Sequence, residues 1–257
     1  MAQPSTDAAL PALGSSRFIF FTDFDGTITQ QDSNDFLIEE FGVGPAQRRL
    51  VFDDILFGRR TFRDGFKELL DGVDLPFPQC VAALLQSITL DEGFREFHAW
   101  TKTHGIPVVV LSGGMEPIIR ALLAHLLGEE EASRLPIMSN KVVPRLGKSI
   151  EDVGGWEIAY RDDSSFGHDK SLHIKPYAAL PEHERPTMFY AGDGVSDFSA
   201  AKGTDLLFAR AGCDLVRYLE KENVPFKKFH DFSDILAVVK DIVTGKTRVH
   251  DVAASKA

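Results

Sequence analysis

Four short apolar runs, each followed by small or polar residues, most constrain what this chain can fold into. They span residues 17–22, 107–111, 187–191 and 205–209. Their β-prone and almost wholly apolar composition is typical of strands buried on both faces, as in a parallel sheet. Helical periodicity appears in stretches at residues 116–127, 196–201, 214–222 and 233–243. This alternation predicts an α/β fold, an open parallel sheet flanked by helices on both faces.

The first two runs are separated by a segment too long for a simple loop, because loops between a strand and a helix usually have ~2–6 residues. Gly and Pro residues divide this segment into helical stretches at residues 33–41, 47–57, 61–70, 78–87 and 91–102. The last stretch leads into the second run and is assigned to the core. The others predict a small α-helical cap domain, inserted after the first strand and lying over the ends of the strands.

These assignments set the expected domain boundaries. The core domain comprises residues 17–29 and 92–247, and the cap comprises residues 30–91. Within the core, alternating apolar residues and several glycines over residues 138–160 predict a short β-hairpin region.

Two aspartates, Asp23 and Asp25, directly follow the first apolar run and precede Gly26 and Thr27. Just past the end of a strand, two such carboxyl groups can converge on one point. One carboxylate can attack phosphorus to give an aspartyl-phosphate. The other can protonate the leaving alkoxide and then take a proton from the attacking water. The same pattern also suits a plain strand end, because Asp and Gly are common in turns.

A second acidic segment, Gly192-Asp193-Gly194-Val195-Ser196-Asp197, follows the third run. Carboxylates facing a phosphoryl dianion would repel it, so this chemistry requires a divalent cation, and Mg²⁺ prefers such oxygen ligands. Asp193 is a candidate metal ligand from the neighbouring strand. Asp197 would hold a metal-bound water or orient its neighbours. The alternative is a tight turn in which Ser196 caps the next helix.

Phosphate-binding groups are expected at two further places. The hydroxyl of Ser112 and the backbone amides of Gly113 and Gly114, at the end of the second run, could hold phosphate oxygens at a helix N-terminus. Lys170 could neutralise the phosphoryl group and the nucleophile together, with Lys175 as the competing candidate. Ser-Gly-Gly is also an ordinary turn, and a single lysine is usually a solvated surface charge.

The order of these motifs is similar to that of the haloacid dehalogenase-like phosphatase superfamily, in its phosphoserine-phosphatase-like branch. The matching residues are Asp23-x-Asp25-Gly-Thr, Ser112, Lys170 and Gly192-Asp193-Gly194-x-x-Asp197. The spacing between Lys170 and Asp193 resembles that of this branch and favours Lys170 over Lys175. The resemblance implies a Rossmann-like parallel sheet with its helical cap after the first strand.

The resemblance also implies a role for each matching residue. Asp23 would be the nucleophile and a metal ligand, and Asp25 the acid and base, with its backbone carbonyl on Mg²⁺. Asp193 would complete the protein ligands of the metal, with Asp197 behind it or bound through water. Ser112, Gly113 and Lys170 would bind the phosphoryl group.

Six segments further resemble the fungal polyol phosphate phosphatases, which act on sugar-alcohol phosphates such as ribitol 5-phosphate and sorbitol 6-phosphate. These segments are residues 21–27, 32–35, 62–66, 112–119, 166–171 and 192–197. The resemblance implies a small phosphomonoester of this class as substrate. Asp32 and Asn34, at the entry to the cap, are candidate hydroxyl-binding residues. Arg63 and His168 are further candidates, although a solvated arginine and a capping histidine are the simpler interpretations.

Composition excludes several other functions. The net charge of −10 argues against a nucleic-acid partner, because a phosphate backbone requires a surplus of Lys and Arg. No apolar run approaches the ~20 residues of a membrane-spanning helix. Residues 1–16 lack the features of a signal peptide and are expected to form a disordered leader, and residues 248–257 a flexible tail. We therefore expect a cytoplasmic protein; the sequence favours neither a monomer nor a dimer.

Three alternatives share the same motifs. A phosphatase for phosphoserine or another small metabolite needs the same core residues, with a different cap. A phosphomutase needs the same pair of aspartates. A non-catalytic binding protein would be expected to have lost Asp23, Asp25 or Lys170, and all three are present.

Overall fold

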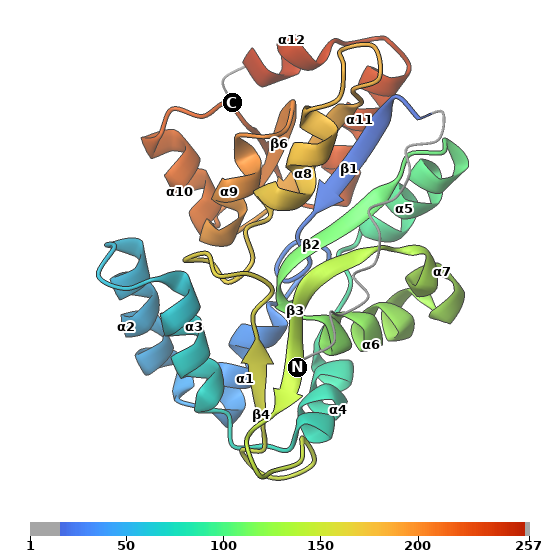
Figure 1. Ribbon diagram of the computed structural model, residues 1–257. Coiled ribbons are helices and arrows are strands. Elements are labelled where there is room, and N and C mark those ends of the chain that lie inside the picture. Colours follow the sequence, from blue (N-terminus) through green and yellow to red (C-terminus); the bar gives the residue numbers. More distant parts are fainter. Residues whose placement is uncertain (1–15, 255–257) are drawn as a thin grey trace.

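The computed structural model describes residues 16–254, so the leader expected at residues 1–16 lies almost wholly outside the described residues (Figure 1). Its centre is a seven-stranded sheet in the order β4-β3-β2-β1-β5-β6-β7. The strands are β1 (Phe18–Thr22), β2 (Val108–Met115), β3 (Ile137–Pro144), β4 (Trp156–Ala159), β5 (Thr187–Gly192), β6 (Leu206–Arg210) and β7 (Lys227–Phe229). Every pair of neighbouring strands is parallel except β3 and β4. The four apolar runs became β1, β2, β5 and β6.

Helices cover both faces of the sheet, because successive side chains of a strand point to opposite faces. Phe20 of β1 packs in the larger apolar cluster, and its neighbours Ile19 and Phe21 pack in the other. The larger cluster includes residues of α5 (Phe94–Thr103), α6 (Glu116–Leu127), α7 (Glu129–Arg134) and α11 (Phe232–Val243). The other includes residues of α8 (Ser171–Ala178), α9 (Phe198–Ala201) and α10 (Asp214–Lys221). The expected α/β architecture is confirmed.

The segment after β1 forms a layer of helices at one end of the sheet (Figure 1). They are α1 (Ser33–Phe41), α2 (Gly44–Leu56), α3 (Phe62–Asp71) and α4 (Phe77–Ser87). Side-chain caps start two of them: Asp32 accepts the N–H groups of Asn34 and Asp35, and Thr61 accepts that of Asp64. Such caps satisfy N–H groups that the first turn of a helix leaves unpaired. The first cap helix therefore begins at the carboxylate of Asp32, ten residues past the end of β1, which places the cap directly over the strand ends.

A hairpin of β3 and β4 is joined to the cap by hydrogen bonds and an ion pair, although its residues lie outside the range 30–91 expected for that domain. The Trp156 indole donates to the carbonyl of Leu75 (2.9 Å), and the Tyr160 hydroxyl donates to that of Arg63 (2.7 Å). Lys67 pairs with Glu157 (2.8 Å). The structural unit above the sheet thus consists of the four helices together with this hairpin.

Other differences from the sequence expectations concern short or non-local elements. β3 also continues the parallel sheet beside β2, and β7 adds a strand at the opposite edge. In place of one helix over residues 196–201, a short 3-10 helix, η1 (Val195–Asp197), precedes α9. Residues expected to form a flexible tail instead contain α12 (Val249–Ala254), because Val249 and Val252, three positions apart, pack against the larger apolar cluster. Between residues 16 and 254 no helix is both long and apolar enough to cross a membrane.

Candidate active site

The carboxyl ends of β1, β2 and β5 meet at a cavity of about 380 Å³ between the sheet and the cap. The core contributes Asp23, Asp25, Ser112, Gly113, Gly114 and Asp193 to its wall. The cap contributes Asp32, Asn34, Asp35, Arg48, Phe52 and Phe62, among others. A crevice beyond the carboxyl ends of parallel strands is the usual ligand site of an open α/β sheet.

Asp23 lies at the floor of the cavity and pairs with Lys170. Only 6% of Asp23 is exposed, its Oδ2 is 2.9 Å from Lys170 Nζ, and its Oδ1 accepts the N–H of Phe24 (2.7 Å). Burial, together with the charges of Asp197 and Asp193, raises the pKa of Asp23 well above its ordinary value, and Lys170 opposes this rise. Burial alone would lower the pKa of Lys170, but Asp197 and Asp23 outweigh it and raise that pKa. Lys170 is therefore a fixed positive charge beside Asp23.

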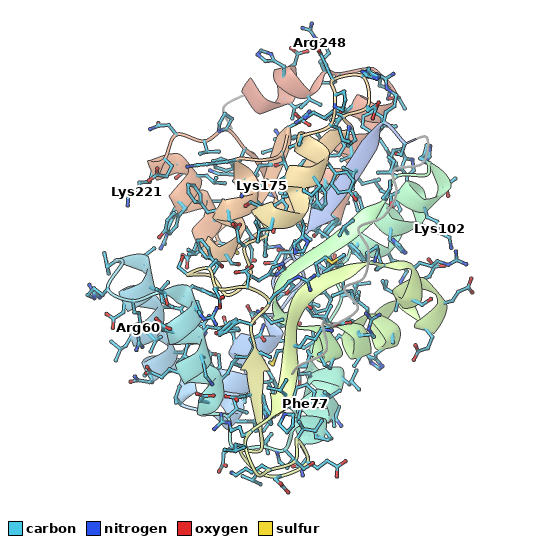
Figure 2. All side chains as sticks on the ribbon, in the orientation of Figure 1. Arg60, Phe77, Lys102, Lys175, Lys221 and Arg248 are labelled. Carbon is cyan, nitrogen blue, oxygen red and sulfur yellow. The ribbon has the colours of Figure 1, made fainter. Side chains whose placement is uncertain are left out.

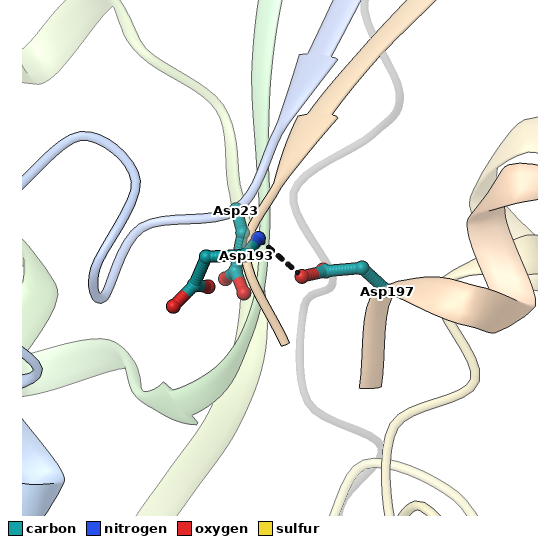
Figure 3. Close-up of side chains that lie close together, drawn as sticks. All are labelled: Asp23, Asp193 and Asp197. Carbon is teal, nitrogen blue, oxygen red and sulfur yellow. Dashed lines mark hydrogen bonds between the residues drawn. The ribbon is translucent and has the colours of Figure 1, made fainter. Parts of the chain in front are cut away.

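Asp23, Asp193 and Asp197 form an acidic cluster, with one oxygen of each within 4.8 Å of the others (Figure 3). Asp197 approaches from the opposite side to the other two and is fully engaged. It binds Lys170 Nζ (2.6 Å) and the Tyr190 hydroxyl (2.5 Å), as well as the N–H groups of Asp193 (3.0 Å) and Gly194 (2.9 Å). Asp197 thus holds its neighbours in place and does not line the cavity.

Asp193 is almost free of protein partners by comparison. Among residues 16–254, its side chain makes one hydrogen bond, a long one from the Thr27 hydroxyl (3.4 Å). Burial, and then the charge of Asp197, raises the pKa of Asp193 well above its ordinary value, because both disfavour the ionised form. Oxygens of Asp23 and Asp193 that face one cavity are a donor set that suits a small, hard divalent cation such as Mg²⁺.

Gly26 makes this approach of β1 and β5 possible. Its φ of +65° favours glycine, and a Cβ at this position would lie 2.4 Å from Asp193 Oδ2. Any larger residue would push the carboxylate of Asp193 away from that of Asp23.

Asp25 is held by the first turn of the cap. Its Oδ1 accepts the N–H of Ser33 (2.9 Å), and its Oδ2 accepts the side-chain N–H of Asn34 (2.9 Å). Burial, and then the charge of Asp32, raises the pKa of Asp25 from 3.8 to about 7, although the hydrogen bonds oppose the rise. A carboxyl group with this pKa can both release and accept a proton near neutral pH.

The loop Ser112-Gly113-Gly114 supplies backbone and hydroxyl groups on the other side of Asp25. The Ser112 hydroxyl oxygen accepts the N–H of Gly114 (2.9 Å), which leaves its own hydrogen free to point elsewhere. A Cβ on Gly114 would lie 2.7 Å from Asp25 Oδ2, so the loop and the acid are in close contact. The structure therefore brings together Asp23, Asp25, Ser112, Gly113, Lys170 and Asp193 as the sequence predicted.

The four predicted substrate-binding residues fall into two groups. Asp32 and Asn34 line the cavity. His168 is buried behind it, where its Nδ1 contacts the carbonyl oxygen of Ser112 (2.7 Å). Arg63 faces the loop of residues 162–165: its N–H donates to Ser165, and its guanidinium donates to the carbonyl of Asp162 and lies over the Tyr160 ring. Arg63 and His168 thus hold loops and do not line the cavity, which corrects their assignment as substrate contacts.

Two other basic residues, one of them Lys175, the competing candidate for the phosphate-binding lysine, also lie away from the cavity. Arg60 pairs with Glu68 (2.6 Å) on the outer side of the cap, and Lys175 is exposed on α8 (Figure 2).

Sequence reasoning missed Arg48, a half-buried residue of α2 that lines the cavity. It pairs with Asp35, lies 3.4 Å from Glu39, and stacks over Phe52 with its guanidinium carbon 4.8 Å from the ring centre. In the sequence it reads as an ordinary helix surface charge, and no local signal distinguishes it.

Comparisons with known proteins agree with this geometry. A family model described as haloacid dehalogenase-like hydrolase matches residues 20–202. Pdp3-interacting factor 1 of Schizosaccharomyces pombe is 49% identical over 215 residues, which cover 84% of this chain and 91% of that protein. Polyol phosphate phosphatase PYP1 of Saccharomyces cerevisiae is 45% identical over 237 residues, which cover 90% of this chain and 96% of that protein.

A solved structure of substrate-bound phosphoserine phosphatase has the same fold. It superposes with a TM-score of 0.64 at 20% identity, and the match covers 87% of this chain and 98% of that one. The chain is thus a homologue of a phosphatase, with the architecture of phosphoserine phosphatases. It belongs to the haloacid dehalogenase-like hydrolase family.

Proposed function

We propose that the protein is a Mg²⁺-dependent phosphomonoesterase that hydrolyses small polyol phosphates through an aspartyl-phosphate on Asp23. One observation carries this proposal: a buried Asp23 lies 2.9 Å from Lys170, in the same cavity as Asp25, whose pKa is about 7. A nucleophile, a fixed positive charge and a proton carrier then face one bound phosphoryl group.

The first step forms a bond between an oxygen of Asp23 and phosphorus while the bond from phosphorus to the polyol oxygen breaks. Asp25 enters this step protonated and gives its proton to the leaving alkoxide. In the second step Asp25, now ionised, takes a proton from water as the water oxygen attacks phosphorus and Asp23 leaves. Both steps use the same carboxyl group in turn, which requires a pKa near neutrality.

Binding groups hold the phosphoryl oxygens through both steps. Lys170 supplies a positive charge, and Ser112 and Gly113 supply neutral donors. When bound by Asp23, Asp193 and the backbone carbonyl of Asp25, Mg²⁺ would neutralise charge between the carboxylates and the phosphoryl dianion. Asp197 keeps Lys170 and the backbone of Asp193 in position.

The cap side of the cavity favours a neutral, hydroxyl-bearing leaving group. Acidic side chains of the cap line it, namely Asp32, Asp35 and Asp53, and Asp214 of the core lines the same cavity. Two arginines of α2, Arg48 and Arg49, also line the cavity, and Arg48 already pairs with Asp35 and has Glu39 beside it. A second anionic group on the substrate would face these carboxylates, whereas hydroxyls can donate to Asp32 and Asn34. The likeness to polyol phosphate phosphatase PYP1 supports ribitol 5-phosphate and sorbitol 6-phosphate as candidates.

The test is a comparison of kcat/KM, measured as released phosphate with Mg²⁺ present, for ribitol 5-phosphate, sorbitol 6-phosphate, phosphoserine and a phosphorylated hydroxy acid. We expect the two polyol phosphates to be preferred. A clear preference for phosphoserine or the carboxylated phosphate would contradict the substrate assignment. Transfer of phosphate to a second position, without release, would indicate a phosphomutase.

A further inference from the structure

Two buried side chains hold the carbonyl groups of Ser112 and Gly113. His168 Nδ1 lies 2.7 Å from the carbonyl oxygen of Ser112, and Asn140 Nδ2 donates to that of Gly113 (2.7 Å). Exposure is 1% for His168 and 0% for Asn140. They come from different parts of the chain, β3 and the segment before α8, and neither lines the cavity.

The hydrogen-bonding partners fix the orientation of both side chains. A carbonyl oxygen only accepts, so His168 must carry its hydrogen on Nδ1. Asn140 Oδ1 accepts the backbone N–H of Arg161 (2.9 Å), which leaves its amino group for Gly113. Neither contact survives a reversal of the ring or of the amide.

These contacts determine where the N–H groups of the loop point. The structure has no cis peptide bond among its described residues, so each C=O is opposite the N–H of the next residue. With the Ser112 carbonyl turned to His168, the Gly113 N–H points away from His168, on the side where Gly113 lines the cavity. With the Gly113 carbonyl turned to Asn140, the Gly114 N–H points to Ser112 Oγ (2.9 Å). Because Oγ accepts that bond, the Ser112 hydroxyl is left as a donor.

Without such contacts the loop would be easily misdirected, because a peptide group between glycines can rotate with little steric hindrance. A rotation of the peptide group after Ser112 or Gly113 would aim a carbonyl oxygen at the bound anion. We propose that His168 and Asn140 are positioning residues. They hold the Ser112-Gly113-Gly114 loop in the conformation in which its hydrogen-bond donors, and not its carbonyl oxygens, face the bound phosphate. This inference rests on the proposed function, in that phosphate is the anion held.

This arrangement leaves one buried polar atom of His168, its Nε2, without a hydrogen bond among the described residues. Leaving a polar atom unpaired in the interior is unfavourable, so an apolar residue would serve better if the position only filled space. Burial also lowers the pKa of His168 to about 3, so the ring is neutral at physiological pH and adds no charge to the site.

The experiment compares variants for binding of inorganic phosphate to the Mg²⁺-loaded protein by calorimetry, and for KM and kcat. His168→Leu and Asn140→Leu remove the donors. We expect each to weaken phosphate binding and raise KM about tenfold, with a smaller change in kcat, because one neutral hydrogen bond is lost from ground state and transition state alike. His168→Asn can place a donor close to the position of Nδ1, and should return phosphate affinity to within about threefold of wild type.

His98→Asn is the matched control, since His98 is a buried histidine that pairs with Glu131 far from the cavity and should leave phosphate affinity unchanged. A purely structural role would lower the unfolding temperature and the active fraction, and hence kcat, without changing phosphate affinity or KM. That pattern, or failure of His168→Asn to improve on His168→Leu, would overturn the inference.

Should His168→Leu misfold, Asn140→Leu carries the same test. Wild-type protein that binds phosphate but releases none from any phosphomonoester would contradict the proposed function alone.

Discussion

Asn34, in the first turn of the cap, donates a hydrogen bond of 2.9 Å to Asp25 Oδ2 in the core. The acid of the site is therefore tied to the domain that is proposed to select the substrate. The bond favours the ionised form of Asp25 and opposes the rise in its pKa. A substitution at Asn34 therefore changes the first turn of the cap and the environment of Asp25 together.

Replacing Asn34 by Leu should move the pH dependence of the reaction. Loss of the bond raises the pKa of Asp25 further, so its protonated form persists to higher pH. Because the first step needs that form, the fall of kcat/KM on the alkaline side should shift to higher pH. The maximum of kcat/KM should nevertheless fall about tenfold, because Asn34 also lines the cavity and its loss removes a candidate hydrogen-bonding group for the substrate. The measurement is a pH profile of kcat/KM for both proteins. If the alkaline side of the pH profile is the same for both proteins, Asp25 is not the group that supplies this proton.

Asp25→Asn should abolish activity and yet stabilise the metal-free protein. The folded-state pKa of Asp25, about 7, is above its ordinary value of 3.8, so ionisation is harder in the folded state. The stability that the protonated group contributes is complete below about pH 4 and is lost as pH rises through about 7. In chelator at pH 8, the variant should unfold several degrees higher than wild type.

At pH 4 that difference should nearly vanish, which makes the low-pH melting curve the internal control. Asn34 Oδ1 has no partner among the described residues and could accept from the new amide. A lower unfolding temperature for Asp25→Asn at pH 8 would contradict the raised pKa.

The core of the site could be predicted from sequence because its groups directly follow apolar strands. Asp23, Ser112 and Asp193 each come at or just after the last residue of a buried run, and parallel strands bring such positions to one edge. Lys170 has no such local signal and depended on the resemblance to a known family.

Other parts of the molecule depend on contacts between distant segments. The hydrogen bond from Trp156 to Leu75 joins residues that share no periodic pattern. Asn140 and Arg48 read as a strand polar residue and a helix surface charge, and their partners appear only when the chain is folded. Arg63 was misassigned for the same reason, since a guanidinium suits a phosphate and a loop carbonyl equally well.

Metal removal should inactivate the protein reversibly. Within the described part of the chain the Asp193 carboxylate accepts a single, long side-chain hydrogen bond, so most of it is available to a cation. We expect excess chelator to abolish turnover and added Mg²⁺ to restore it. Asp193→Asn should require at least about tenfold more Mg²⁺ for half-maximal activity. Full turnover in excess chelator would show that the reaction does not need the cation.

Arg63→Ala and Asp32→Ala should have opposite signatures. Arg63 holds the loop of residues 162–165, so its loss should lower the unfolding temperature by a few degrees while KM for a polyol phosphate changes less than about threefold. Asp32 lines the cavity, so its loss should raise KM about tenfold or more, together with some loss of the helix cap. A large KM effect at Arg63 and none at Asp32 would reverse the placement of these two residues.

The most direct test of the central claim is to trap the phosphorylated protein. Wild-type protein is mixed with labelled substrate and Mg²⁺, quenched in acid during turnover, and digested for mass spectrometry. We predict the phosphoryl group on Asp23, and neither label nor measurable turnover in Asp23→Asn, whose kcat should fall by several orders of magnitude. A phosphoryl group on another residue, or near-normal turnover by Asp23→Asn, would contradict the account.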